Sequence, residues 1–164
     1  MGVSGSGKST IALALATRLN LQFIEGDSLH SEENLEKMSR GDALSDDDRT
    51  PWLRVIGQKI SDAQSRGLGC VAACSALKRS YRDTLRSYAP EAFFVMLAGT
   101  FALIQSRLEA RPHNFMPLSL LASQFATLEP LHSDERGVCV DITLTPEEIL
   151  SQIETELRDC LKPI

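Results

Sequence analysis

The sequence predicts an α/β fold in which helices cover a parallel sheet, within one domain spanning residues 1–164. Three observations lead to this prediction. Short apolar segments alternate with helical segments along the chain. The apolar segments at 69–74 and 93–97 show no polar alternation, which is typical of strands buried on both faces. A glycine-rich loop at the start leads directly into a helical segment.

The elements before residue 50 follow from local signals. Residues 8–19 suit a helix that begins directly at the glycine loop, and residues 21–25 read as a short strand that ends before Asp27. Ser31 caps a polar helix whose early glutamates interact favourably with the helix dipole, and Gly41 ends it.

The middle of the chain repeats the alternation of helix and strand. Thr50 and Pro51 predict the start of a helix that runs to Gly67. Its expected buried face consists of Trp52, Val55, Ile56, Ile60 and Ala63. The strand at 69–74, a helix at 78–88 and the strand at 93–97 follow.

The last third contains two helices around an interruption, then a strand and a helix. Thr100 caps a helix that reaches about Arg111, residues 112–117 interrupt it, and a second helix continues to about Phe125. Residues 138–142 form the next strand. Thr145 and Glu148 make a capping box for the final helix.

Composition restricts the class of partner. The net charge is −5 and the basic residues are scattered, which argues against nucleic acid and for a small molecule. No apolar run approaches the roughly 18 residues of a membrane span, and no leader pattern is visible, so we expect a cytoplasmic protein. Cys70, Cys74, Cys139 and Cys160 form no CxxC pair and are interpreted as small buried hydrophobic residues in a reducing compartment.

The loop at the start fits G-x-x-x-x-G-K-[ST], a pattern that binds nucleotide phosphates. Glycines let consecutive backbone N–H groups converge on phosphate oxygens, at the positive end of the following helix. Lys8 would bridge the β- and γ-phosphates, and the Ser9 hydroxyl would bind Mg²⁺. The residues expected to bind ATP here are Gly2, Val3, Ser4, Gly5, Ser6, Gly7, Lys8, Ser9 and Thr10.

Asp27 is the acidic residue at a clear strand end. The strand at 69–74 ends in Cys74 and Ser75 and offers no carboxylate. Asp27 can therefore accept the proton of an acceptor hydroxyl or hold a magnesium-bound water. The alternative is an ordinary turn aspartate after Gly26.

Longer stretches resemble one family. They are MGVSGSGKS (1–9), GDSLHSEENLEKMSRGDALSDDDRTPWL (26–53), CSALKRSYRDTLR (74–86) and FMPLSLLASQFATLEPL (115–131). These stretches resemble the thermoresistant gluconokinases, small kinases related in architecture to shikimate and nucleoside monophosphate kinases. The resemblance implies a three-layer fold with sheet order 2-3-1-4-5. It also implies transfer of the γ-phosphoryl group of ATP to the 6-hydroxyl of D-gluconate, in sugar-acid catabolism that feeds the pentose phosphate pathway, and a homodimer.

Gluconate carries one carboxylate, for which Arg49, Lys78 or Arg82 can supply the cation. Arg49 is the first choice because its guanidinium offers a two-pronged fork, although it can instead pair with the acidic run at 46–48. We interpret that run as solvated charge near a helix start. By resemblance, His30 and Gln124 line the substrate site.

The resemblance also places a mobile lid at about 107–120. Arg107 and Arg111 lie four residues apart and share a helical face. We expect Arg107 to bind ATP and Arg111 to act in catalysis, whereas spacing alone would suggest a solvated arginine stripe. Asn114 stands where relatives usually carry His, with His113 one place earlier, so the role of that histidine is open.

The strand that should precede the loop is missing from the sequence. By resemblance it is the central strand of the sheet, so we expect it to be truncated here and the numbering to begin at an internal methionine of a longer gene product. Two other functions stay open. One is another small-molecule kinase, such as shikimate kinase, and the other is a non-catalytic nucleotide-binding protein.

Overall fold

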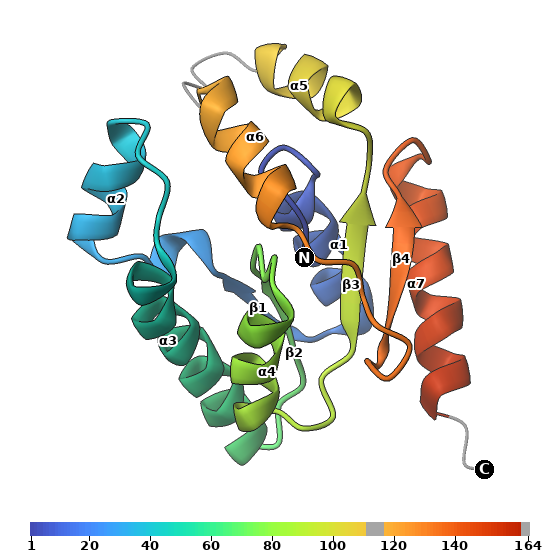
Figure 1. Ribbon diagram of the computed structural model, residues 1–164. Coiled ribbons are helices and arrows are strands. Elements are labelled where there is room, and N and C mark those ends of the chain that lie inside the picture. Colours follow the sequence, from blue (N-terminus) through green and yellow to red (C-terminus); the bar gives the residue numbers. More distant parts are fainter. Residues whose placement is uncertain (111–116, 162–164) are drawn as a thin grey trace.

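The computed structural model describes residues 1–110 and 117–161, and Figure 1 shows strands flanked by helices. In chain order the elements are α1 (Lys8–Leu19), β1 (Gln22–Glu25), the 3-10 turn η1 (Asp27–Leu29), α2 (Glu32–Ser39), α3 (Asp46–Ser65), β2 (Cys70–Ala73), α4 (Arg79–Tyr88), β3 (Phe94–Ala98), α5 (Phe101–Glu109), α6 (Leu118–Thr127), β4 (Gly137–Asp141) and α7 (Pro146–Leu161). The predicted alternation of strands and helices is confirmed.

The strands form two parallel pairs. In one pair β1 lies beside β2, with Gln22 opposite Cys70. In the other β3 lies beside β4, with Phe94 opposite Gly137. Within each pair the carboxyl ends of the two strands lie at the same edge, where parallel sheets gather ligands.

Met1 and Gly2 link the two pairs of strands. The amino group of Met1 donates to the carbonyl of Val95, and the amide of Leu97 donates to the carbonyl of Met1 at 2.9 Å. On the other side, the amide of Gly2 donates to the carbonyl of Ser75 at 3.1 Å. The order is therefore β1-β2, then Met1 and Gly2, then β3-β4, which is the order that the resemblance implied.

An apolar cavity lies beside this link. Its volume is about 480 Å³, and its walls include Met1, Leu15, Val71, Leu85 and Phe94. Burial, assisted by the charge of Lys8, lowers the pKa of the Met1 amino group to about 5. Within the described residues, Met1 and Gly2 occupy the position between β2 and β3.

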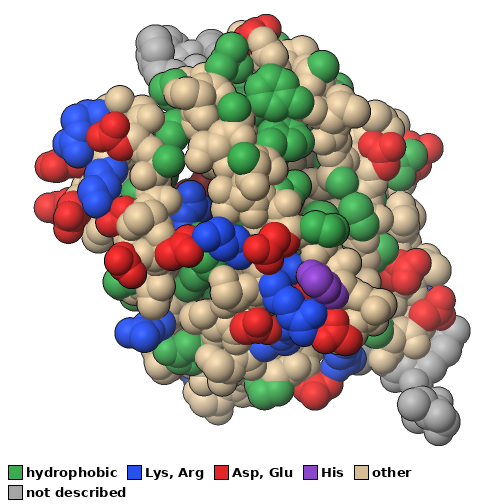
Figure 2. Space-filling view, in the orientation of Figure 1, with side chains coloured by type: hydrophobic (Ala, Val, Ile, Leu, Met, Phe, Trp, Pro, Cys, Tyr) green, Lys and Arg blue, Asp and Glu red, His purple; other side chains and the backbone are tan. Residues whose placement is uncertain are grey.

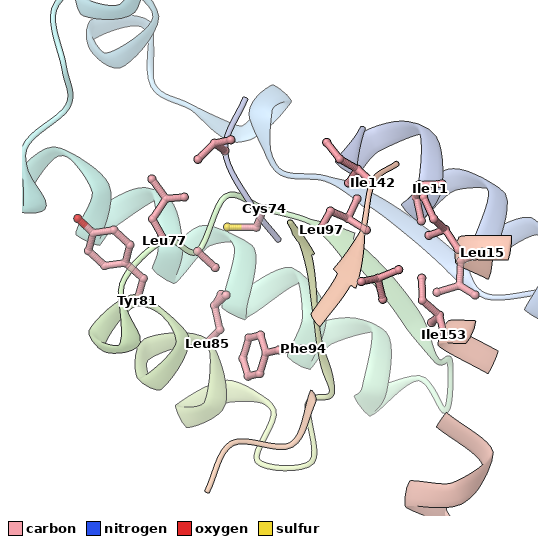
Figure 3. Close-up of a cluster of buried hydrophobic side chains, with 14 of the residues drawn as sticks. Ile11, Leu15, Cys74, Leu77, Tyr81, Leu85, Phe94, Leu97, Ile142 and Ile153 are labelled. Carbon is pink, nitrogen blue, oxygen red and sulfur yellow. The ribbon is translucent and has the colours of Figure 1, made fainter. Parts of the chain in front are cut away.

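Helices complete three layers. On one face α1 packs on β1 and β2 and against α7, which also covers β4. On the other face α3 packs on β1 and β2 and against α4. Figure 3 shows the resulting core, where Ile11 and Leu15 of α1, Leu97 of β3 and Ile153 of α7 gather.

One helix start was predicted wrongly. Helix α3 begins at Asp46, four residues before Thr50 would start it, and contains Pro51. The hydroxyl of Ser45 accepts from the amide of Asp48 at 3.2 Å, while the Asp48 carboxylate accepts from the amide of Ser45 at 2.8 Å. This capping box outweighs the proline signal because it satisfies two backbone N–H groups at once.

The predicted buried face of this helix also needs one correction. Val55 is 44% exposed, whereas Trp52, Ile56 and Ala63 are buried as expected. The earlier helix start does not change that face, because the 3.6-residue period is set by the same apolar positions.

The surface differs from the expectation for cysteine. Cys74 is buried, but Cys139 and Cys160 are exposed, so the interpretation of the cysteines as buried residues is wrong for these two.

Figure 2 shows charged side chains of both signs over α2 and α4, and hydrophobic side chains around α5 and α6. Among the helices described, none combines the length and the apolar character needed to cross a membrane.

Candidate active site

The glycine loop curves from Gly2 to the start of α1, at the carboxyl edge of the sheet. Three of its residues have left-handed or otherwise positive φ: Gly2 at 135°, Gly5 at 82° and Gly7 at 93°. Residues with a Cβ atom rarely adopt these values, so the path of the loop depends on glycine.

Close packing adds a second reason for two of these glycines. A Cβ atom on Gly2 would lie 2.7 Å from the carbonyl oxygen of Leu97, and one on Gly5 would lie 2.9 Å from Cγ of Leu108. The loop is therefore pressed against β3 and α5, and these contacts hold its backbone amides in place.

Lys8 and Ser4 make two of the polar contacts of the loop. Nζ of Lys8 donates to the carbonyl of Val3 at 3.0 Å, and the amide of Ser4 donates to Oε1 of Gln124 at 2.7 Å. Gln124 lies on α6, so the segment after the expected lid contacts the phosphate loop directly. Ser9 is exposed in the first turn of α1, where its hydroxyl is accessible to a ligand.

Asp27 lies at the same edge, on a turn that is held from two sides. The amide of Gly26 donates to the carbonyl of Ala73 at 2.8 Å, and Nε1 of Trp52 donates to the carbonyl of Gly26 at 2.8 Å. Asp27 itself is exposed. Its carboxylate therefore stands on a rigid base that β2 and α3 provide.

The buried thiol of Cys74 indicates how near these charges are. Burial raises the pKa of Cys74 to about 11, while the positive charge of Lys8 opposes this rise and the negative charge of Asp27 adds to it. Both charges thus act on one thiol at the end of β2, which places Lys8 and Asp27 around the same strand end.

His30 follows the Asp27 turn. Its ring stacks on Trp52 with centroids 4.2 Å apart, and its Nδ1 lies 3.5 Å from Nδ2 of Asn34. Burial lowers the pKa of His30, and the charge of Arg49 lowers it further against the opposing effect of Asp27. His30 is therefore neutral at pH 7, suited to hydrogen-bonding a hydroxyl.

Arg49 and Lys78 lie near the starts of two helices and approach the same aromatic ring. Cζ of Arg49 is 5.8 Å, and Nζ of Lys78 5.6 Å, from the centroid of Tyr81. Nε of Arg49 also donates to the carbonyl of Leu44 at 3.3 Å. The structure therefore brings together the two cations that the sequence proposed for a carboxylate.

The third proposed cation, Arg82, lies elsewhere. Its side chain has no exposed surface, and it forms two 2.7 Å hydrogen bonds to the carboxylate of Glu135. It also donates to backbone carbonyls, including that of Pro130 at 3.0 Å. Since all of its surface is used internally, Arg82 fastens α4 to the segment before β4, and we leave it out of the substrate site.

The lid residues are described only in part. Arg107 on α5 is half-buried, and its Nη2 donates to the carbonyl of Ile142 at 2.6 Å. Arg111, His113 and Asn114 lie outside the described residues. The expected roles of Arg107 and Arg111 stay predictions.

Two side chains near these cations were not identified from the sequence. Tyr81 donates its hydroxyl to Asp46, and Nζ of Lys78 binds the same carboxylate at 2.7 Å. Asp46 and Asp47 are exposed, as the interpretation of residues 46–48 as solvated charge predicts, although Asp46 also pairs with Lys78. The interpretation is wrong for Asp48, whose side chain is only 15% exposed and pairs with Lys37 at 2.6 Å. Tyr81 lies three residues after Lys78 on α4, a spacing that would have indicated it.

Known proteins resemble this chain in sequence and in fold. Residues 1–131 match the family model described as an AAA domain. The chain is 45% identical to the gluconokinase of Gluconobacter oxydans, over 93% of this chain and 86% of that protein. It is 44% identical to the thermoresistant gluconokinase of Escherichia coli, over 85% of this chain and 80% of that protein.

Solved structures agree with these relatives. A gluconokinase from Sinorhizobium meliloti superimposes with a TM-score of 0.86 at 43% identity, covering 97% of this chain and 89% of its own. A sugar kinase from Janibacter superimposes with a TM-score of 0.92 at 45% identity, covering 96% and 91%. The relatives and the solved structures therefore agree on one family of kinases.

Proposed function

Because this chain belongs to the gluconokinase family, we propose that it transfers the γ-phosphoryl group of ATP to the 6-hydroxyl of D-gluconate, giving 6-phospho-D-gluconate and ADP. One observation from the structure carries the proposal. The exposed Asp27 follows β1, Lys78 follows β2 and approaches the same aromatic ring as Arg49, and the phosphate loop follows Met1 and Gly2 between the two pairs of strands. The loop suits the phosphates of a nucleotide, and the two cations suit the carboxylate of an acidic polyol.

The loop would hold the nucleotide. Its backbone amides and the N-terminus of α1 suit the β- and γ-phosphates, and Lys8 supplies a positive charge beside them. The Ser9 hydroxyl fits Mg²⁺, which takes few protein ligands and shares its remaining positions with phosphate oxygens and water. Bound there, the ion neutralises charge on the phosphates. We expect Arg107 and Arg111 to approach the same phosphates from the lid.

Asp27 would serve the acceptor. In the proposed step the 6-hydroxyl oxygen forms a bond to the γ-phosphorus as the bond to the bridging oxygen of ADP breaks. The hydroxyl proton passes to the carboxylate of Asp27, and ADP leaves with the electron pair of the broken bond. The hydrogen bond from Trp52 to Gly26 matters here because a carboxylate that moves by 1 Å is a much poorer base.

The remaining residues would bind the sugar acid. Arg49 and Lys78 suit its carboxylate, and neutral His30 suits a hydroxyl. Gln124, which contacts the phosphate loop through Ser4, lies where it can contact donor or acceptor.

The test is an assay of ADP release in which gluconate, D-glucitol, shikimate and nucleoside monophosphates are offered in turn. D-Glucitol is the polyol with a hydroxymethyl group in place of the carboxylate. We expect release only with gluconate, its loss in Lys8→Ala, and a fall in kcat of at least about 100-fold in Asp27→Asn. Asp42→Asn, at an exposed ion pair with Arg40, is the control and should leave kcat unchanged.

The two alternatives predict other results in this assay. Release with shikimate or a nucleotide would identify another small-molecule kinase, and nucleotide binding without any release would identify a non-catalytic protein. An unchanged kcat in Asp27→Asn would show that Asp27 is an ordinary turn aspartate and does not act in catalysis. A homodimer and a cytoplasmic location stay predictions.

A further inference from the structure

A carboxylate of the protein already lies on the cations proposed for the substrate. Nζ of Lys78 lies 2.8 Å from Oδ1 and 2.7 Å from Oδ2 of Asp46, so both oxygens accept from the ammonium. The hydroxyl of Tyr81 donates to Oδ1 as well. Arg49 stands close enough for its charge, after the hydrogen bonds from Lys78 and Tyr81, to help lower the pKa of Asp46. Asp46 is therefore ionised at neutral pH.

The exposure of these groups differs in a way that permits exchange. The side chain of Asp46 is 61% exposed, whereas that of Lys78 is 30% exposed. Tyr81 is buried, at 5% exposure. A χ1 rotation can thus move the Asp46 carboxylate into water. Its two donors, Lys78 and Tyr81, keep their places at the start of α4.

We propose that Asp46 occupies the carboxylate subsite in the unliganded protein and leaves it when a sugar acid binds, so that only an anionic substrate can take its place on Lys78 and Tyr81. This inference rests on the proposed function and adds a residue that competes with the substrate for its carboxylate subsite. Asp46 acts on the substrate through the cations and takes no part in phosphoryl transfer.

The physical reason is a balance of like charges. When the carboxylate of gluconate replaces that of Asp46, Lys78 exchanges one anion for another, and the released Asp46 regains its hydration. A neutral polyol offers no anion, so Lys78 stays paired with Asp46. Asp46 therefore weakens the binding of every ligand that needs this subsite, and only ligands with a carboxylate need it.

Calorimetric titration of gluconate and D-glucitol into the whole chain, with Asp46→Asn beside the unsubstituted protein, tests the proposal. Asparagine keeps the shape and removes the competing charge. Since an exposed ion pair of this kind contributes little, the Kd for gluconate should fall about two- to five-fold. The Kd for D-glucitol should stay unchanged.

Asp47→Asn is the matched control. Asp47 is exposed and lies beside Asp46 in the first turn of α3, so its loss removes the same charge from the same helix end. It should leave both affinities unchanged. Tyr81→Phe removes one donor to Asp46 without changing any charge, and it provides a second measurement if Asp46→Asn does not fold.

The outcomes are distinct. An unchanged or higher Kd for gluconate in Asp46→Asn overturns the proposal, because Asp46 would then hold Lys78 in place for the substrate. Equal changes for gluconate and D-glucitol overturn it too, as does the absence of gluconate binding in both proteins. Tyr81→Phe should bind gluconate with a Kd within about two-fold of the unsubstituted value, and a larger loss of affinity counts against exchange at this subsite. Gluconate binding without ADP release contradicts only the proposed function, since the ratio of the two Kd values still measures the competition.

Discussion

Lys78 and Arg82 lie four residues apart at the start of α4, and the structure uses these two cations in opposite ways. Arg82 and its partner Glu135 have no exposed side-chain surface. Lys78 pairs with Asp46, and both keep access to water. The sequence offers the two cations as equals, but only the exposed one is available to a ligand.

The difference lies in how many acceptors each cation satisfies. Arg82 binds both oxygens of Glu135 and four backbone carbonyls, those of Ala76, Leu77, Glu129 and Pro130. A planar guanidinium can satisfy such a set, whereas a lysine ammonium has three donors on a flexible stem. A cation with all donors engaged in a dry interior is part of the fold, and one with an exposed partner can exchange it.

The largest expected effect is the loss of the buried pair. Arg82→Met should lower the free energy of unfolding by about 3–5 kcal/mol, because it removes the principal donor to Glu135 and a donor to several buried carbonyls. Urea denaturation measures this. Arg79→Met, at the exposed pair with Asp134, is the control and should lower the free energy of unfolding far less.

If Arg82→Met lowers the free energy of unfolding by less than Arg79→Met does, the contrast between the buried Arg82 and the exposed Lys78 is wrong. The double variant Arg82→Met with Glu135→Leu sharpens it, because an apolar replacement of a buried ion pair often restores stability. Arg86 also donates to Glu135, at 3.1 Å, so the restoration should be incomplete.

The pH dependence of the free energy of unfolding should also depend on the pair of Arg82 and Glu135. The hydrogen bonds from Arg82 lower the pKa of Glu135 to about 2 in the folded protein. A depressed folded pKa contributes stability above the unfolded value, near 4.3, and that stability is lost as the pH falls toward 2. The loss should be on the order of 2–3 kcal/mol.

Urea denaturation at several pH values between 2 and 6 measures this loss. Glu135→Gln should be less stable throughout but should show a shallower decline below pH 4.5, because the titrating group is gone. Asp48, whose pKa is also lowered to about 2 by its hydrogen bond from Lys37, leaves a residual slope in that variant. An unchanged slope would mean that Glu135 does not carry the acid sensitivity.

Local signals predicted most of the fold. Ser31, Thr100 and Thr145 each cap the helix that was expected of them, because a cap depends on residues three positions away. The phosphate loop is likewise a local pattern, with its glycines and Lys8 at fixed spacing. The four strands lie within two residues of their predicted bounds.

The roles of the charged residues depend on distant partners and could not be predicted in this way. Arg82 and Glu135 are 53 residues apart, and Lys78 and Asp46 are 32 apart. Which side chain becomes buried is decided when α4 packs on α3 and on the segment before β4. The start of α3 was missed for a local reason, since Ser45 and Asp48 compete with the proline signal.

The smallest expected effect on stability belongs to the exposed pair. Lys78→Met should change the free energy of unfolding by less than about 1 kcal/mol, because both partners are partly hydrated and the longer contacts with Tyr81 survive as packing. Gluconate affinity should nevertheless fall, since one of the two proposed carboxylate cations is lost, while D-glucitol affinity stays the same. Combining Lys78→Met with Asp46→Asn sharpens the comparison further. If Asp46 acts only through Lys78, then Asp46→Asn should improve gluconate binding in the unsubstituted protein but not in Lys78→Met. An equal improvement of gluconate affinity in both backgrounds would show that Asp46 repels the substrate through the electrostatic field around Arg49. Lys78 and Arg82 would then differ in burial, but Lys78 would not exchange Asp46 for the substrate.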